Sequence, residues 1–159
     1  PNAAHFGLAR LEKDFDVISD IWSVTSFNEL RRDGLDCERW NMLNPEAAPR
    51  VSYVEQMMKD RTGPIIAATD YMKSYADQIR PFLPSNNTQQ APYKVLGTDG
   101  FGRSDTRKKL RHFFEVNRYF VTIAALKSLA EAGVIANSEV SRAIKLYNIA
   151  QNKPNPTTI

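Results

Sequence analysis

The sequence is poor in the side chains that form disulfides and bind metals. Its 159 residues include one cysteine, Cys37, and two histidines, His5 and His112. One cysteine excludes an internal disulfide and is typical of a reducing compartment, so we expect a cytoplasmic protein. The two histidines are far apart in sequence, and no Cys-x-x-Cys or His-x-x-x-His spacing occurs. No zinc-binding motif is therefore present.

Cys37 is also a poor candidate for a catalytic nucleophile. It lies between Asp36 and Glu38, and neighbouring carboxylates oppose formation of the reactive thiolate. We therefore interpret Cys37 as a structural or incidental residue rather than a reactive one.

Long apolar runs and a strong charge of one sign are missing as well. No apolar run approaches the about 18 residues of a membrane span, and no signal peptide is visible, so no membrane partner is expected. The net charge is only +3, which argues against a nucleic-acid partner. A single local excess of positive charge occurs at Arg103, Arg107, Lys108, Lys109 and Arg111. It can be the solvated face of a helix or a phosphate-binding patch, and we favour the helix face.

What the sequence has is the composition of one globular domain spanning residues 1–159, with 42% hydrophobic and 25% charged residues. Apolar periodicity predicts helices and strands in alternation. Strands are predicted over residues 17–24, 65–69 and 93–96. Helices are predicted over residues 3–15, 28–43, 72–82 and 119–132, with others beginning at Ser52, Ser104 and Ser138. We therefore predict an α/β fold with three layers, in which helices cover both faces of a mostly parallel sheet.

Two segments between these elements are marked by turn-forming residues. The polar stretch 84–92 predicts a surface loop rather than a domain boundary, because strand and helix signals resume directly after it. Gly133 is expected to end the helix over 119–132, since glycine readily takes the left-handed conformation at that position.

The most informative segment is the glycine-rich loop over residues 97–105. It lies between a predicted strand and a predicted helix, and this arrangement occurs at the ligand-facing edge of α/β sheets. Ser104 could cap the helix, with Asp105 in its first turn. The candidate ligand or interface residues are Asp99, Gly100, Phe101, Arg103, Ser104, Asp105 and His112.

Two interpretations of this loop stay open. The helix start at Ser104, with Arg103 and Arg107 nearby, could bind an anion. A tight strand-to-helix turn explains the glycines without a ligand, and the loop matches neither the dinucleotide nor the P-loop pattern. His112 could similarly converge with Asp99 and Asp105 or form an ordinary helix hydrogen bond. The residues thus predict an α/β domain with no self-contained catalytic constellation.

Several unusual stretches resemble one family, the homodimeric bacterial pyruvate dehydrogenases that form the decarboxylating component of a multienzyme complex. The resemblance extends over about residues 15–156. The stretches that carry it are 21–30 (IWSVTSFNEL), 32–34 (RDG), 36–43 (DCERWNML), 69–73 (TDYMK), 97–105 (GTDGFGRSD) and 110–116 (LRHFFEV).

The resemblance implies an oxidoreductase that decarboxylates pyruvate and passes the acetyl group to lipoyl groups on a dihydrolipoyl acyltransferase core. This chain resembles only its C-terminal, transketolase-like domain. In the family, thiamine diphosphate and Mg²⁺ lie between the two preceding domains, across the dimer interface. Their Gly-Asp-Gly…Asn motif has no counterpart here, so we assign no catalytic, cofactor-binding or metal-binding residue. The isolated segment is expected to be inactive and to bind no cofactor.

The resemblance also implies an architectural role, with contacts to the remaining domains of the same enzyme and to a homodimer partner. Large apolar residues such as Trp40, Phe101 and Phe113 fit that role. In the family an apolar strand and a Gly-Ser-Gly turn precede the first helix, whereas this sequence starts at Pro1. Without that strand a sheet edge would be unpaired, which favours association. The alternative function is an anion-binding or protein-binding regulatory module that uses loop 97–105.

Overall fold

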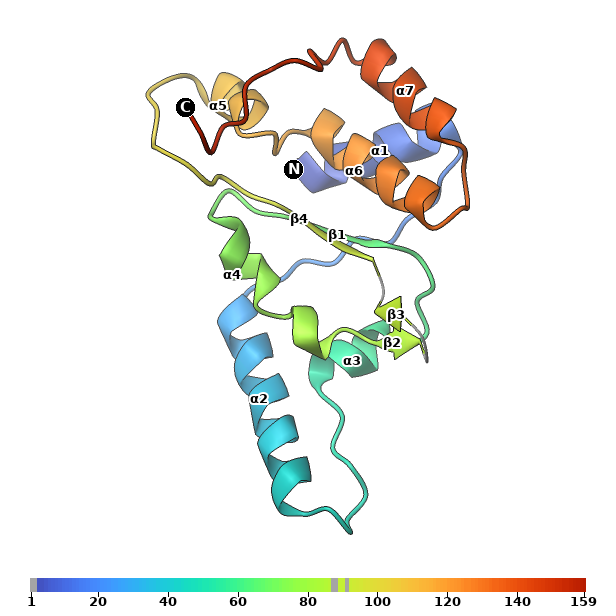
Figure 1. Ribbon diagram of the computed structural model, residues 1–159, viewed down its shortest axis with the longest axis vertical. Helices are drawn as coiled ribbons and strands as arrows, with labels where there is room; N and C mark the ends of the chain where they lie inside the picture. The colour runs from blue at the N-terminus through green and yellow to red at the C-terminus, as the bar shows by residue number, and fades with distance from the viewer. Residues whose placement is uncertain (1–2, 87–88, 91) are drawn as a thin grey trace.

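The structure is a computed structural model that describes residues 3–86, 89–90 and 92–159 (Figure 1). Its centre is a parallel pair of strands, β1 (Ile65–Ala68) and β4 (Tyr93–Leu96). Ile65 pairs with Tyr93 and Ala68 with Leu96, so both strands end at the same edge of the sheet.

Helices cover both faces of this sheet, as Figure 1 shows. One layer contains α1 (Ala3–Phe15), α6 (Arg118–Glu131) and α7 (Asn137–Leu146). The other contains α2 (Phe27–Leu43), α3 (Tyr53–Met58) and α4 (Lys73–Asp77). The short helix α5 (Arg107–Phe113) lies beyond the end of β4, near the C-terminal tail. The predicted three-layer α/β architecture is confirmed, with a smaller sheet than expected.

Each face of the sheet has its own hydrophobic cluster, because alternate strand residues point to opposite faces. The first cluster is formed by Val54, Ala76, Ile79, Phe82, Leu83, Tyr93 and Val95, and Ile65 and Ala67 pack against it. The second is formed by Leu11, Ala125, Leu126, Val140 and Ala143, and Ile66 packs against it. β1 therefore contributes to both clusters.

Short polar side chains cap the first turn of four helices, α2, α3, α5 and α6. The hydroxyl of Ser26 accepts a hydrogen bond from the Glu29 amide, and that of Ser52 accepts one from the Glu55 amide, each at 3.2 Å. Asn117 accepts from the amides of Tyr119 and Phe120 at 2.9 and 3.2 Å. These bonds satisfy amides that have no partner within the helix.

The predicted strand over residues 17–24 is absent from the structure. This segment has no regular secondary structure and connects α1 in one layer to α2 in the other. Ile18 is 88% exposed, and Trp22 and Val24 are also exposed. The prediction was wrong because β-branched residues favour a half-buried sheet surface, and no neighbouring strand pairs with this segment.

Other element boundaries differ from the predictions. The helix over 72–82 is split into α4 and a 3₁₀ turn, η1 (Arg80–Phe82), because Pro81 has no amide hydrogen and disfavours a continuous α-helix. The loop over 84–92 contains a small antiparallel pair, β2 (Ser85–Asn86) and β3 (Gln89–Gln90). The rest of that predicted loop includes positions 87, 88 and 91, which lie outside the described residues.

The last two helix boundaries test the remaining cap predictions. Gly133, with φ of 73°, follows α6 as predicted. Ser138 was a wrong cap prediction, because α7 begins at Asn137 after Ala136, without a side-chain cap. In the described part of the chain, no helix has the length and apolar character needed to cross a membrane.

Candidate functional site at the carboxyl edge of the sheet

The loops that follow β1 and β4 lie against each other where both strands end. The Thr98 amide donates to the Tyr71 carbonyl at 2.8 Å, and the Thr98 hydroxyl donates to the Asp70 carbonyl at 3.2 Å. The Asp99 carboxylate accepts from the Lys73 amide at 2.9 Å and lies 3.7 Å from the Lys73 ammonium. The glycine-rich loop is therefore fixed at its start by the loop that follows β1.

Two of the three glycines in this loop are required by their surroundings. A Cβ on Gly97 would lie 2.6 Å from the Tyr71 carbonyl oxygen and 2.8 Å from the Lys73 nitrogen. Gly100 has φ of 107°, and a Cβ there would lie 2.5 Å from the Pro156 carbonyl oxygen. The C-terminal tail thus lies directly against the loop. Gly102 has open space where its Cβ would be.

The helix after the loop starts later than predicted. Thr106, not Ser104, is the N-cap of α5, and its hydroxyl accepts from the Lys109 amide at 3.4 Å. Asp105 precedes the helix instead of lying in its first turn, and its carboxylate accepts from the Thr106 amide at 2.7 Å. The proposed anion site at Ser104 consequently has no helix start there.

Most cations around the loop already have partners. Arg111 pairs with Asp70 through two nitrogens, one of them 3.1 Å from the carboxylate, and Arg107 approaches the same carboxylate at 3.7 Å. Lys109 lies 3.6 Å from Asp105. The Arg103 guanidinium lies 4.6 Å from the centroid of the Phe113 ring, a favourable cation–π geometry. These cations do not converge on one point where a phosphate could bind.

Of the two interpretations of His112, the structure supports the ordinary hydrogen bond and not convergence with Asp99 and Asp105. Nδ1 of His112 lies 3.3 Å from the side-chain nitrogen Nδ2 of Asn117. The centroids of the His112 and Phe120 rings are 5.7 Å apart. Asp99 pairs with Lys73 and Asp105 with Lys109. Within the described ranges, no three His, Cys, Asp or Glu side chains are grouped as a metal site requires.

Cys37 lies half-buried on α2. Burial raises the pKa of its thiol, and the carboxylates of Asp33 and Asp36 raise the pKa further, against an opposing effect of Arg50. The thiol is therefore held in its unreactive, protonated form at neutral pH.

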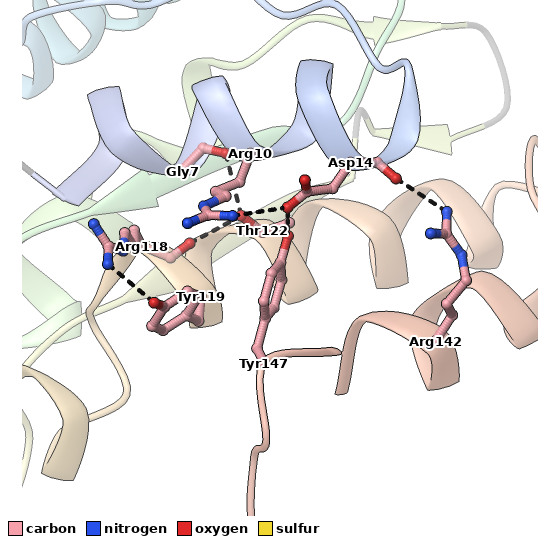
Figure 2. Close-up of polar contacts among 8 residues, drawn as sticks. All are labelled: Gly7, Arg10, Asp14, Arg118, Tyr119, Thr122, Arg142 and Tyr147. Atoms are coloured by element: carbon pink, nitrogen blue, oxygen red, sulfur yellow. Dashed lines mark hydrogen bonds and ion pairs between the residues drawn. The ribbon is translucent and has the colours of Figure 1, made fainter. Parts of the chain in front are cut away.

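A second polar cluster, which the sequence did not indicate, joins α1 to the C-terminal helices (Figure 2). The Tyr147 hydroxyl donates to the Asp14 carboxylate at 2.9 Å, and Arg10 contacts the same carboxylate at 3.3 Å. Arg142 donates to the Asp14 carbonyl at 3.1 Å. Burial raises the pKa of Tyr147, and the hydrogen bond to Asp14 adds to this effect.

This cluster borders a shallow groove of about 230 Å³. Its lining residues are Arg10, Asp14, Tyr119, Leu146, Tyr147 and Asn148. Sequence reasoning missed it because Asp14 and Tyr147 are 133 positions apart and match no motif. Their side chains are satisfied by each other, so the cluster connects the first and last helices.

Comparison with known proteins identifies what this architecture is. A model of the transketolase-like TK C-terminal domain family matches residues 5–117. The chain belongs to this family. The matched region includes both strands of the parallel sheet, the glycine-rich loop and α5.

Close relatives share a single name. The chain is 56% identical over 149 residues to the pyruvate dehydrogenase E1 component of Cupriavidus necator. It is 58% identical over 146 residues to that of Pseudomonas aeruginosa and 53% identical to that of Escherichia coli K12. These alignments cover 92 to 94% of this chain but only 16% of each relative.

Among the described residues, the carboxylates at the sheet edge do not form a site for Mg²⁺. Mg²⁺ requires several oxygen ligands around one point, and the carboxylates at the sheet edge, Asp70, Asp99 and Asp105, are separately paired with cations. We therefore assign no step of thiamine chemistry to these residues.

Proposed function

We propose that this chain is the C-terminal domain of a homodimeric pyruvate dehydrogenase E1 component. The longer protein would use thiamine diphosphate and Mg²⁺ to decarboxylate pyruvate, and would pass the acetyl group to the lipoyl groups of a dihydrolipoyl acyltransferase core in the cytoplasm. The observation that carries this proposal is sequence identity above one half, over more than nine-tenths of the chain, to relatives that bear this name.

Within that enzyme the role of this domain is architectural. It contributes contacts to the other domains and to the dimer partner, while reactive groups come from elsewhere in the protein. Exposed large apolar side chains support this role, because such surface is a common feature of interfaces. They include Ile18, Trp22, Met42, Leu43 and Tyr71.

The activity is tested with the longer protein that contains this sequence. We expect the purified protein, with thiamine diphosphate and Mg²⁺, to reduce ferricyanide in the presence of pyruvate and to acetylate a free lipoyl domain. Omission of thiamine diphosphate should abolish both signals, and 2-oxoglutarate should replace pyruvate poorly. Absence of pyruvate turnover under these conditions would refute the proposed activity.

The architectural role has a separate test on residues 1–159 alone. Circular dichroism first establishes that the segment is folded. Titration calorimetry with thiamine diphosphate and Mg²⁺ should then give no heat of specific binding. A micromolar site on the folded segment would show that this domain holds the cofactor and is not solely architectural.

A further inference from the structure

We propose that α5 and residues 101–106 before it form a docking surface for an acidic segment of another polypeptide chain that also carries apolar side chains. The inference rests on the charge and exposure of this surface and is independent of the reaction that the longer protein performs.

The first observation is an excess of positive charge. Five cationic side chains, Arg103, Arg107, Lys108, Lys109 and Arg111, lie within nine positions. They face two carboxylates, those of Asp70 and Asp105. Three positive charges remain unbalanced, which equals the net charge of the whole chain. The formal charges of the rest of the chain therefore cancel in total, and neighbouring pairs such as Lys73 with Asp99 are balanced.

The excess is also accessible. The side chains of Arg107 and Lys109 are largely exposed, and Lys108 is exposed on the same helix. Within the described part of the chain, no carboxylate lies within ion-pair distance of Arg103 or Lys108. The stacking of Arg103 on Phe113 leaves its charge at the surface. A surface of this kind attracts an acidic partner and accelerates its association.

The second observation is an aromatic side chain held in solvent. Phe101 is 79% exposed and lies two residues from Arg103. The residues before it are held in place, because Gly100 is packed against the carbonyl of Pro156 and the Asp99 carboxylate accepts from the Lys73 amide. Aromatic side chains and arginine are enriched in the cores of protein–protein interfaces.

The arrangement favours an acidic polypeptide over the other polyanions. A phosphate group needs donors that converge, whereas these cations extend along a helix and its preceding loop. Single-stranded nucleic acid needs several stacking aromatics, and Phe101 is the one large aromatic exposed on the described part of this surface. A peptide with acidic side chains could pair with the cations along α5, and its apolar side chains could contact the Phe101 ring.

The test uses the full-length protein and a fluorescein-labelled peptide of twelve residues, eight glutamates and four leucines, followed by anisotropy. Arg103→Glu with Lys108→Glu should weaken binding about ten-fold, since each lost attraction is replaced by repulsion. Phe101→Ser should weaken it by a similar factor. The matched control, Lys13→Glu with Lys145→Glu, makes the same charge change on exposed residues of α1 and α7 and should leave binding unchanged.

Further comparisons decide the outcome. The peptide with glutamine for glutamate should not bind, and added salt should weaken binding of the acidic peptide. An unaltered thermal midpoint for each variant confirms that the fold is retained. The proposal is overturned if the acidic peptide does not bind, if the control variant loses as much affinity, or if a twelve-nucleotide thymidine strand or inorganic phosphate binds equally tightly.

Discussion

At Gly97 the loop after β4 lies so close to the loop after β1 that no side chain fits between them. The backbone of Gly97 does not need the left-handed conformation, so its constraint is one of space alone. A methyl group would overlap two backbone atoms, and backbone cannot rotate away as a side chain can. The bonds from Thr98 and Asp99 to that same loop depend on this close approach.

Replacement of Gly97 by alanine should therefore destabilise the protein by about 1–3 kcal/mol, the usual cost of forcing extra volume into packed structure. The matched change is Gly102→Ala, in the same loop but with no atom within 4 Å of the added group. It should be neutral or stabilising by up to about 1 kcal/mol. Urea unfolding measures both, and equal costs at the two positions would contradict this explanation.

Tyr147 makes stability depend on pH in the alkaline range. Its pKa is raised in the folded protein by burial and by the bond to Asp14, so the folded state keeps the phenol proton after the unfolded chain has released it. This contribution is complete below the unfolded pKa of about 10 and is lost as the pH rises above it. Stability should thus fall with increasing pH.

Replacing Tyr147 with phenylalanine tests this dependence. The variant should lose about 1 kcal/mol near pH 8, because the hydrogen bond to Asp14 is removed. Between about pH 8 and pH 11 its stability should fall less steeply than that of the unmodified protein. The comparison cancels the titration of lysines, which both proteins share. Parallel pH profiles from urea unfolding would contradict the role assigned to Tyr147.

At the scale of single elements, several helices end in the same way without glycine. Asp16, Glu115 and Asn148, which lie one or two residues after α1, α5 and α7, have φ of 54°, 62° and 51°. In each case the next residue donates back into the last turn, as Val116 does to Arg111 at 2.9 Å. Gly133 ends α6 with the same pattern and was predicted, because glycine marks the left-handed position in a sequence. The other three carry no such mark.

The N-cap residues of helices were also predicted correctly in some cases and wrongly in others. Ser52 was identified because a short hydroxyl residue precedes an amphipathic run, and the structure confirms it. At α5 the segment Ser104-Asp105-Thr106 offers three possible caps, and tertiary contacts decide among them. Asp70 binds Arg111 and Arg107, which fixes where the helix lies. The pair of Asp70 with Arg111 joins the loop after β1 to α5 across 41 positions, which local sequence patterns do not reveal.

Single substitutions distinguish the predicted cap of α5 from the observed one. Thr106→Ala should cost about 1 kcal/mol, because the Lys109 amide loses its partner. Ser104→Ala should change stability by less than about 0.5 kcal/mol, since the residue is exposed and caps no helix. Thermal unfolding of the two variants gives the comparison, and a larger loss for Ser104 would restore the original prediction.

At the scale of the whole molecule, the two hydrophobic clusters are separated by a sheet of only two strands. The sequence predicted both layers, because helices alternate with strands along the chain, and helices that connect parallel strands cover both faces of the sheet. It predicted a larger sheet, since β-branched residues at 17–24 resemble a strand locally. Ile65 and Ala67 face one cluster and Ile66 the other, so β1 should transmit loss of packing between layers.

Leu126→Ala tests this coupling. Leu126, on α6, is fully buried in the second hydrophobic cluster. Its truncation should lower the free energy of unfolding by about 2–5 kcal/mol. Trp22 and Trp40 lie outside that layer, so their fluorescence should report the same lowered midpoint as far-UV circular dichroism. Leu146→Ala, at a 55% exposed position on α7, should have little effect. Two separate transitions would show that the layers unfold independently.

The layer that joins α1 to α6 and α7 has a consequence for synthesis in the cell. Thr122 bonds to the Gly7 carbonyl across 115 positions, and Tyr147 reaches Asp14 across 133. At translation rates of roughly 5–20 residues per second, the apolar side of α1 is synthesised on the order of ten seconds before α6 and α7, against which it packs. A nascent chain of this sequence should therefore be a substrate for ribosome-associated chaperones until α7 has emerged.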